Sequence, residues 1–172
     1  KALSNCFEAI RELYKLSIGK TNKEEYFKLR IEGLFLLIKI YGRRSTIKEL
    51  ARCHARKSEC PNQMILLDRM KQVLIIVEKI LNQKNEISKF YTSEIMAKYH
   101  FYMGEYFFKK SQYLWENIQY GADIDDNDRN EMDKCYVHAE DFYNKALDYY
   151  KKYPEWYCIE RAHAERSIGD TL

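Results

Sequence analysis

A row of cations along one predicted helix is the feature of this sequence that most clearly suggests chemistry. The row lies in and just beyond the stretch "IKIYGRRSTIKEL", which runs from Ile38 to Leu50. Lys39 stands four residues before Arg43, and a run with the same spacing contains Arg44, Lys48, Arg52 and Arg56. No acidic residue lies between Glu32 and Glu49. Because like charges at this spacing destabilise a helix by about 0.2–0.5 kcal/mol per pair, the row predicts a neighbouring or bound anion.

The charges on their own allow two simple interpretations. Water, or acidic side chains of a neighbouring helix, would make the row an ordinary solvated or ion-paired helix face. Alternatively, RNA or another acidic polymer would contact Arg44, Lys48, Arg52 and Arg56 and would bind with a steep dependence on salt. The net charge of +3 is mild, so nucleic acid is not the expected partner.

The elements that would position these side chains are helices. The chain has 172 residues with only 6 Gly and 2 Pro, and runs of β-branched residues bounded by turns are few, so little of it would form a sheet. We predict an all-α fold, an antiparallel bundle joined by short loops, in a single domain over residues 1–172. The expected helices cover about Leu3 to Ile18, Thr21 to Lys57, Gln63 to Asn82, Thr92 to Tyr120, Glu131 to Lys152 and Glu155 to Asp170.

Apolar stripes at helical spacing support this assignment. One stripe contains Phe27, Ile31, Leu34, Ile38 and Tyr41, and a second contains Leu66, Met70, Val73, Val77 and Ile80. Gly42 interrupts the first pattern and predicts close packing rather than a helix end. The aromatic residues from Tyr99 to Tyr113 are expected to pack between helices, and the acidic segment "GADIDDNDRN" is expected to be a solvated loop.

Other functional classes find little support in the sequence. The four histidines have no nearby serine or cysteine arrangement, and a glycine-rich phosphate loop is missing, so we expect a binding protein rather than an enzyme, with no cofactor. The five cysteines are scattered and are expected to be reduced and structural. No apolar run is long enough to cross a membrane and the first residues do not resemble a signal peptide, so we expect a cytoplasmic protein.

Several blocks resemble one family, the 14-3-3 proteins. "GRRSTIK" (Gly42 to Lys48) is similar to part of their third helix, and "VLIIVEKIL" (Val73 to Leu81) resembles their fourth. "YHFYMGEYFFKK" (Tyr99 to Lys110) resembles their fifth helix, and "AEDFYNKALDYY" is similar to their sixth. The blocks occur in the family's order, and the resemblance covers helices two to seven of the family's nine. It therefore implies a 14-3-3-type bundle that is incomplete at both ends.

The resemblance also implies a function. The family is usually dimeric and binds phosphoserine or phosphothreonine segments of partner proteins in a concave basic groove. Arg44 matches the groove arginine of the third helix and Lys48 the base one turn later, so Arg44 is expected to be the main phosphate contact. Arg43, Lys39 and Lys109 are expected to assist. This implies a signalling adaptor that forms homodimers and recognises phosphorylated proteins.

The sequence also departs from the family. The lysine that the family places two turns before its groove arginine would fall at Leu37 or Ile38, and the Arg-Tyr pair that completes its phosphate pocket appears as Phe108-Lys109. The asparagine that grips the ligand backbone falls at about Ala162 or His163. These departures favour an alternative function, a phosphate-independent scaffold. Such a scaffold would bind an acidic or amphipathic helix, as tetratricopeptide-repeat proteins do.

Overall fold

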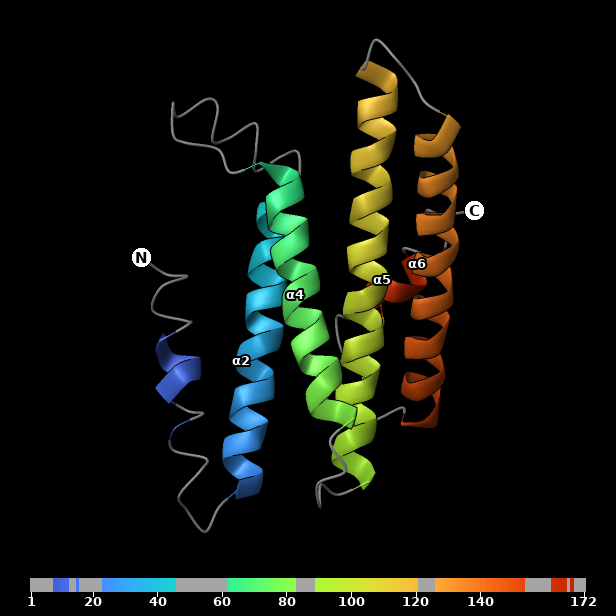
Figure 1. The fold of residues 1–172 in the computed structure, drawn as a ribbon. Coiled ribbons are helices and arrows are strands. Elements are labelled where there is room, and N and C mark those ends of the chain that lie inside the picture. Colours follow the sequence, from blue (N-terminus) through green and yellow to red (C-terminus); the bar gives the residue numbers. More distant parts are fainter. Residues whose placement is uncertain are drawn as a thin grey trace.

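The computed structural model describes residues 8–12, 15, 23–45, 62–82, 89–120, 126–153, 162–166 and 168, and this part of the chain is helical, with no strand. Its long helices are α2 (Lys23–Arg44), α4 (Gln63–Asn82), α5 (Lys89–Tyr120) and α6 (Asp126–Lys152). They run alternately up and down, and each lies beside the next in the chain (Figure 1). The predicted all-α, antiparallel bundle is therefore confirmed.

The two predicted apolar stripes form the core between α2, α4 and α5. Ile31, Leu34, Ile38 and Tyr41 are all buried on α2, and Phe27 packs partly buried against them. All five stripe residues of α4 are buried as well. Burial of apolar side chains contributes about 25 cal/mol per Å² removed from water, so these stripes supply much of the driving force for α2 and α4 to associate.

The end of α2 shows the largest difference from the sequence-based expectation. We expected the second helix to continue to about Lys57, but α2 ends at Arg44 and Ser45 lies in a turn. The Ser45 hydroxyl donates to the Gly42 carbonyl at 2.8 Å. Serine in this role competes with the helical backbone bonds, and a glycine in the last turn weakens the helix further. Residues 46–61 lie outside the described part of the chain.

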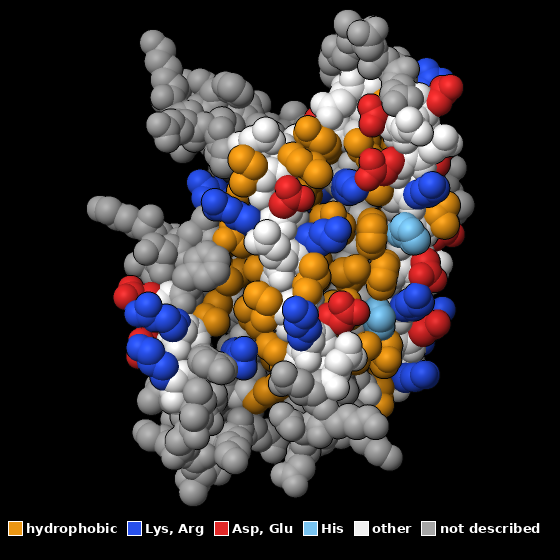
Figure 2. Space-filling view, viewed as in Figure 1, with side chains coloured by type: hydrophobic (Ala, Val, Ile, Leu, Met, Phe, Trp, Pro, Cys, Tyr) orange, Lys and Arg blue, Asp and Glu red, His pale blue; other side chains and the backbone are white. Residues whose placement is uncertain are grey.

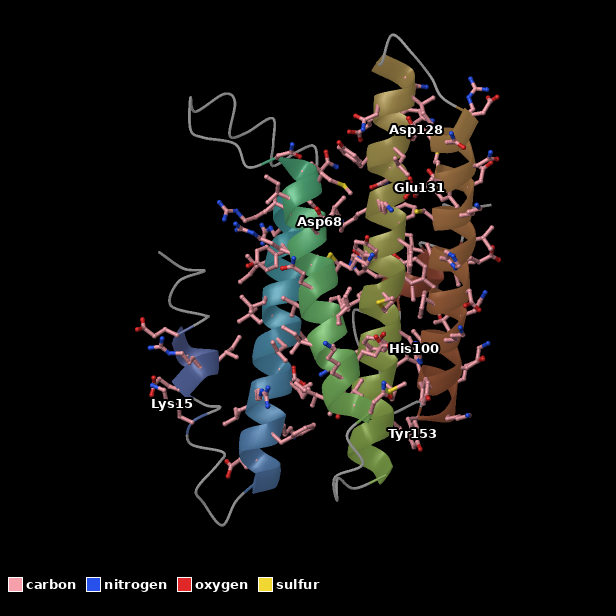
Figure 3. The ribbon with its side chains drawn as sticks, in the orientation of Figure 1. Lys15, Asp68, His100, Asp128, Glu131 and Tyr153 are labelled. Atoms are coloured by element: carbon pink, nitrogen blue, oxygen red, sulfur yellow. The ribbon has the colours of Figure 1, made fainter. Side chains whose placement is uncertain are left out.

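The beginning of α6 was also predicted wrongly. We expected a loop as far as Asn130, yet α6 begins at Asp126 and carries Asp126 and Asp128 in its first turn. Acidic side chains there interact favourably with the positive end of the helix dipole. Asp128 and Glu131 both lie in the first part of this helix (Figure 3). The polar composition that suggested a loop instead suits a helix N-terminus.

Aromatic side chains fill the contact between α5 and α6, as predicted. Phe101 and Tyr106 on α5 and Tyr143 on α6 are buried, and the Phe101 and Tyr143 rings lie 5.9 Å apart. Gly104 leaves the space that the Tyr143 ring fills, because a Cβ atom built on Gly104 would lie 2.7 Å from that ring. Cys135 is buried nearby as a free thiol, and burial raises its pKa. The other four cysteines lie outside the described residues.

His100 occupies an aromatic setting between α5 and α6 (Figure 3). Its ring stacks on Phe142 at 5.9 Å and on Tyr149 at 5.7 Å, and its buried Nδ1 has no hydrogen-bond partner in the part of the chain that the structure describes. Burial, assisted by the positive charge of Lys145 and opposed by Asp141, lowers the pKa of His100 to about 4. The folded protein therefore holds this imidazole neutral at pH values where an unfolded chain would protonate it.

This histidine should make stability depend on pH. A histidine in the unfolded chain has a pKa of about 6.5, so between about pH 6.5 and 4 the unfolded state binds the extra proton and the free energy of unfolding falls as the pH falls. His100→Phe removes the titrating group and leaves no polar atom unpaired. Urea unfolding at pH 7, 5.5 and 4 should show a smaller loss of stability for this variant than for the parent. Parallel pH profiles for the two proteins would contradict the assignment.

The face seen in Figure 2 carries apolar side chains in a band along α4 and α5, with basic and acidic side chains scattered among them. The exposed apolar residues on α4 include Ile65 and Ile76. No helix in the described residues combines the length and the apolar character that crossing a membrane requires.

Candidate functional site: a cationic pocket between α2 and α5

A pocket of about 290 Å³ lies where α2, α4 and α5 meet, with His163 from the short helical segment 162–166 also at its wall. Its charged residues are Lys39 and Arg43 from α2 and Glu105 and Lys109 from α5. Among the described residues, the wall therefore carries three cations and one carboxylate. The volume is close to the lower end of the range typical of small-ligand pockets, about 300–1,000 Å³.

The local structure of α2 explains why the cations converge. Lys39 and Arg43 are four residues apart and lie on the same face of the helix, since one turn takes 3.6 residues. Gly42 is buried beside them, and a Cβ atom built on it would lie 3.4 Å from Lys109 Cε. The Lys109 side chain of α5 therefore packs against α2 at Gly42, at a distance that an added methyl group would also tolerate.

Apolar and aromatic side chains form much of the rest of the pocket wall. They are Ile38 from α2, Met70 from α4, and Phe101 and Tyr102 from α5. Tyr102 is held in place by stacking on Phe35 of α2, with ring centroids 5.4 Å apart. Lys109 is the most buried of the three cations, so its interaction with an anion is the least screened.

Glu105 links the pocket to α6. Its Oε2 lies 3.7 Å from Lys109 Nζ, while its Oε1 accepts a hydrogen bond from the Tyr143 hydroxyl at 2.8 Å. The side chains of Lys109 and Glu105 are only 16% and 21% exposed. The two residues stand four apart on α5, a spacing that places opposite charges side by side on a helix. By contrast, Lys39 has no ion-pair partner among the described residues.

The predicted phosphate-binding residues divide into three groups. Lys39, Arg43 and Lys109 all line the pocket. Arg44 is exposed and is not among the lining residues, so its assignment as the main phosphate contact stays a prediction. Lys48 lies outside the described residues, as do Arg52 and Arg56 of the alternative RNA-binding row.

Phe108 and His163 clarify two departures from the 14-3-3 pattern. Phe108 occupies the place of the family's second arginine, but its ring packs against Tyr136 of α6 at 6.3 Å and does not line the pocket. An arginine at position 108 is therefore not expected to add a phosphate contact in this pocket. His163, one of two candidates for the asparagine position, does line the pocket.

Sequence reasoning did not assign Glu105, Met70, Phe101 or Tyr102 to the site. The last three were attributed to the core, where they are indeed buried. Glu105 carried a usable signal, since it stands four residues before Lys109 on the same helix face. The sequence could not show that this face of α5 opens onto α2.

Comparison with known proteins gives no further assignment: no family model, no curated protein and no solved structure matches this chain.

Proposed function

We propose that this protein is a non-enzymatic adaptor that binds phosphoserine or phosphothreonine segments of partner proteins in the cationic pocket. The observation that carries the proposal is the convergence of Lys39, Arg43 and Lys109 from two helices on one pocket. A phosphorylated side chain brings about −1.5 to −2 charges and three acceptor oxygens. Ammonium and guanidinium groups match these oxygens with charge-assisted hydrogen bonds.

The balance of charge supports a strongly anionic ligand. Among the described lining residues three cations stand beside one carboxylate, an excess of positive charge that suits a phosphate dianion. Arg43 offers a planar guanidinium that can bind two phosphate oxygens at once, while the lysines act as point charges. The apolar wall leaves room for an uncharged part of the ligand beside the phosphate.

The resemblance to 14-3-3 proteins supports the same function independently of the geometry. The "GRRSTIK" block includes the end of α2, and the "YHFYMGEYFFKK" block lies in α5, the two helices that supply the cations. On the same ground we propose a divergent 14-3-3-type bundle, self-association into homodimers and a cytoplasmic location. Sedimentation that shows only monomer at high micromolar concentration would count against self-association.

The function can be tested with one peptide library synthesised in phosphorylated and unphosphorylated forms. Fluorescence polarisation should show tighter binding of the phosphorylated member of responding pairs, by roughly tenfold or more, because one charge-assisted hydrogen bond contributes about 1.5–3 kcal/mol. The difference should shrink as salt is added. Equal binding of both forms across the library would refute phosphate recognition.

Equal binding would instead favour a phosphate-independent helical scaffold. One observation supports this second candidate: Phe108 packs against α6 where the family has its second phosphate-binding arginine. The α5–α6 hairpin also packs small residues against aromatic ones, with Gly104 against Tyr143, as helical-hairpin scaffolds do. Under this alternative, an unphosphorylated amphipathic helix would bind the protein with the same affinity in the parent and in Arg43→Ala.

A further inference from the structure

We infer that Glu105 competes with the ligand for Lys109. Its carboxylate pairs with the Lys109 ammonium group and thereby limits the affinity of the pocket for an external anion. The inference rests on the proposed function, since it concerns how the same pocket binds phosphate. It assigns Glu105 a role that its position on a core-facing helix would not suggest. Glu105 acts through Lys109 and is thus a positioning residue.

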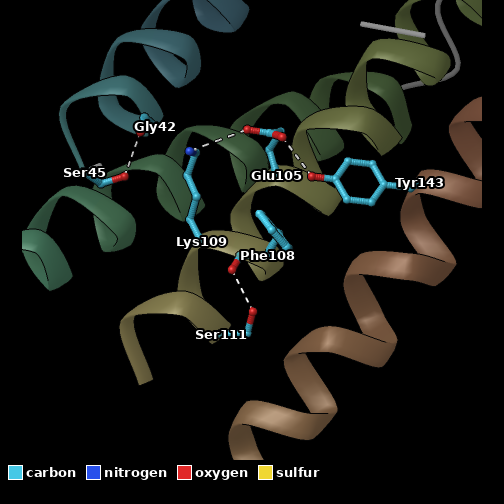
Figure 4. A network of polar contacts seen from close by, with 7 residues as sticks. All are labelled: Gly42, Ser45, Glu105, Phe108, Lys109, Ser111 and Tyr143. Carbon is cyan, nitrogen blue, oxygen red and sulfur yellow. Dashed lines mark hydrogen bonds and ion pairs between the residues drawn. The ribbon is translucent and has the colours of Figure 1, made fainter. Parts of the chain in front are cut away.

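The inference rests on the hydrogen bond that holds the Glu105 carboxylate in place from the α6 side. Tyr143 is fully buried on α6, and its hydroxyl donates to Glu105 Oε1 at 2.8 Å. This bond leaves Oε2 as the oxygen near Lys109 (Figure 4). Because Tyr143 is buried, Glu105 cannot swing freely away from the pocket when an anion enters it.

The ion pair is placed so that Lys109 can exchange partners. The distance of 3.7 Å between Lys109 Nζ and Glu105 Oε2 exceeds the 2.7–3.2 Å or so of a good hydrogen bond. Lys109 is therefore attracted by Glu105 without being tightly bonded to it. A phosphate near Lys39 and Arg43 would compete for the same ammonium group, and it would also be repelled by the Glu105 carboxylate.

A second ion pair on α5 provides a matched control. Lys110, the next residue, pairs with Glu131 of α6, and neither of these two residues lines the pocket. Glu131→Gln therefore removes the carboxylate that pairs with Lys110 and leaves the pocket unaltered. Glu105→Gln makes the same chemical change inside it, and the glutamine oxygen can still accept the hydrogen bond from Tyr143.

The experiment measures binding of a fluorescent phosphopeptide and its unphosphorylated form to five proteins: the parent, Glu105→Gln, Glu131→Gln, Lys109→Met, and Glu105→Gln combined with Lys109→Met. We expect Glu105→Gln to bind the phosphorylated form about two- to tenfold more tightly than the parent, since releasing a partly exposed ion pair is worth up to about 1 kcal/mol or slightly more. Glu131→Gln should bind as the parent does. The gain in affinity from Lys109→Met to the double variant should be less than half of the gain from the parent to Glu105→Gln.

Each outcome decides the inference. Unchanged or weaker binding by Glu105→Gln overturns it, and so does an undiminished gain in the Lys109→Met background, because Glu105 would then act by general repulsion. A parent that ignores the phosphate while Glu105→Gln prefers it supports the inference but refutes the proposed function of the native chain. If neither protein distinguishes the two peptides, both proposals fail. Thermal unfolding of all variants confirms that the comparison is made between folded proteins.

Discussion

Arg43→Ala is expected to weaken binding of a phosphorylated peptide by roughly ten- to a hundredfold, whereas Arg44→Ala should weaken it by about threefold or less. A charge-assisted hydrogen bond contributes about 1.5–3 kcal/mol, which corresponds to the larger loss. Arg43 lines the pocket and Arg44 does not. Successive residues of a helix differ in direction by about 100°, so the two adjacent arginines cannot serve one pocket equally.

The comparison of these two variants is informative because the sequence alone assigned the main contact to Arg44. Both residues are exposed and lie in the last turn of α2, so their removal should affect helix stability to a similar degree. Fluorescence polarisation with the phosphorylated peptide measures the loss, and Arg69→Ala on the exposed surface of α4 controls for the general effect of charge. A larger loss for Arg44→Ala than for Arg43→Ala would restore the sequence-based assignment and place the phosphate outside this pocket.

Gly104→Ala is expected to lower the free energy of unfolding by about 1–3 kcal/mol. A Cβ atom at this position would lie 2.7–3.0 Å from three atoms of the Tyr143 ring. The ring is fully buried and bonded through its hydroxyl to Glu105, so it cannot move aside easily, and overpacked cores typically lose stability by this amount. Urea unfolding followed by circular dichroism measures the change.

The matched control is Gly42→Ala on α2. There a Cβ atom would meet Lys109 Cε at 3.4 Å and Met70 Sδ at 3.5 Å, which is close to ordinary contact. Because alanine stabilises a helix interior by about 1 kcal/mol relative to glycine, this variant should be as stable as the parent or more stable. Equal destabilisation by the two substitutions would show that the Tyr143 contact does not set the cost at Gly104.

The sequence predicted the helices best where an apolar stripe defines them. The predicted helix from Gln63 to Asn82 agrees with α4 at both ends. Its stripe is regular, and Asn62 marks the beginning, since its side-chain oxygen accepts a hydrogen bond from the Met64 amide at 2.8 Å. Asparagine is a preferred residue at this position. Pattern and capping residue thus indicate the same boundary.

The errors occurred where local interactions compete with the pattern. Ser45 follows a helical sequence without proline or a polar cluster, yet α2 ends at Arg44 and Ser45 lies in a turn. The first residues of α6 were assigned to a loop because aspartate and asparagine are common in loops. The same residues also suit the first turn of a helix, and composition alone cannot separate the two cases.

The site was only partly predictable for a different reason. Lys39, Arg43 and Lys109 were all among the candidates, but their relative importance depends on rotation about the α2 axis. A shift of one residue in the comparison with 14-3-3 proteins exchanges Arg43 for Arg44. The sequence alone does not determine which of the two arginines faces the groove. The carboxylate of Glu105 enters the site only through the packing of α5 against α2, a contact between elements that are not adjacent in the chain.

That contact also bears on the order in which the molecule assembles and opens. The helices α5 and α6 share the most extensive interface among the described elements and follow each other directly in the chain, whereas α2 and α5 share the smallest of the main interfaces, with α4 between them in sequence. Contacts between chain neighbours form fastest during folding. We therefore expect the α2–α5 contact at the pocket to form late and to separate early, and we expect a ligand that bridges these two helices to slow their local separation.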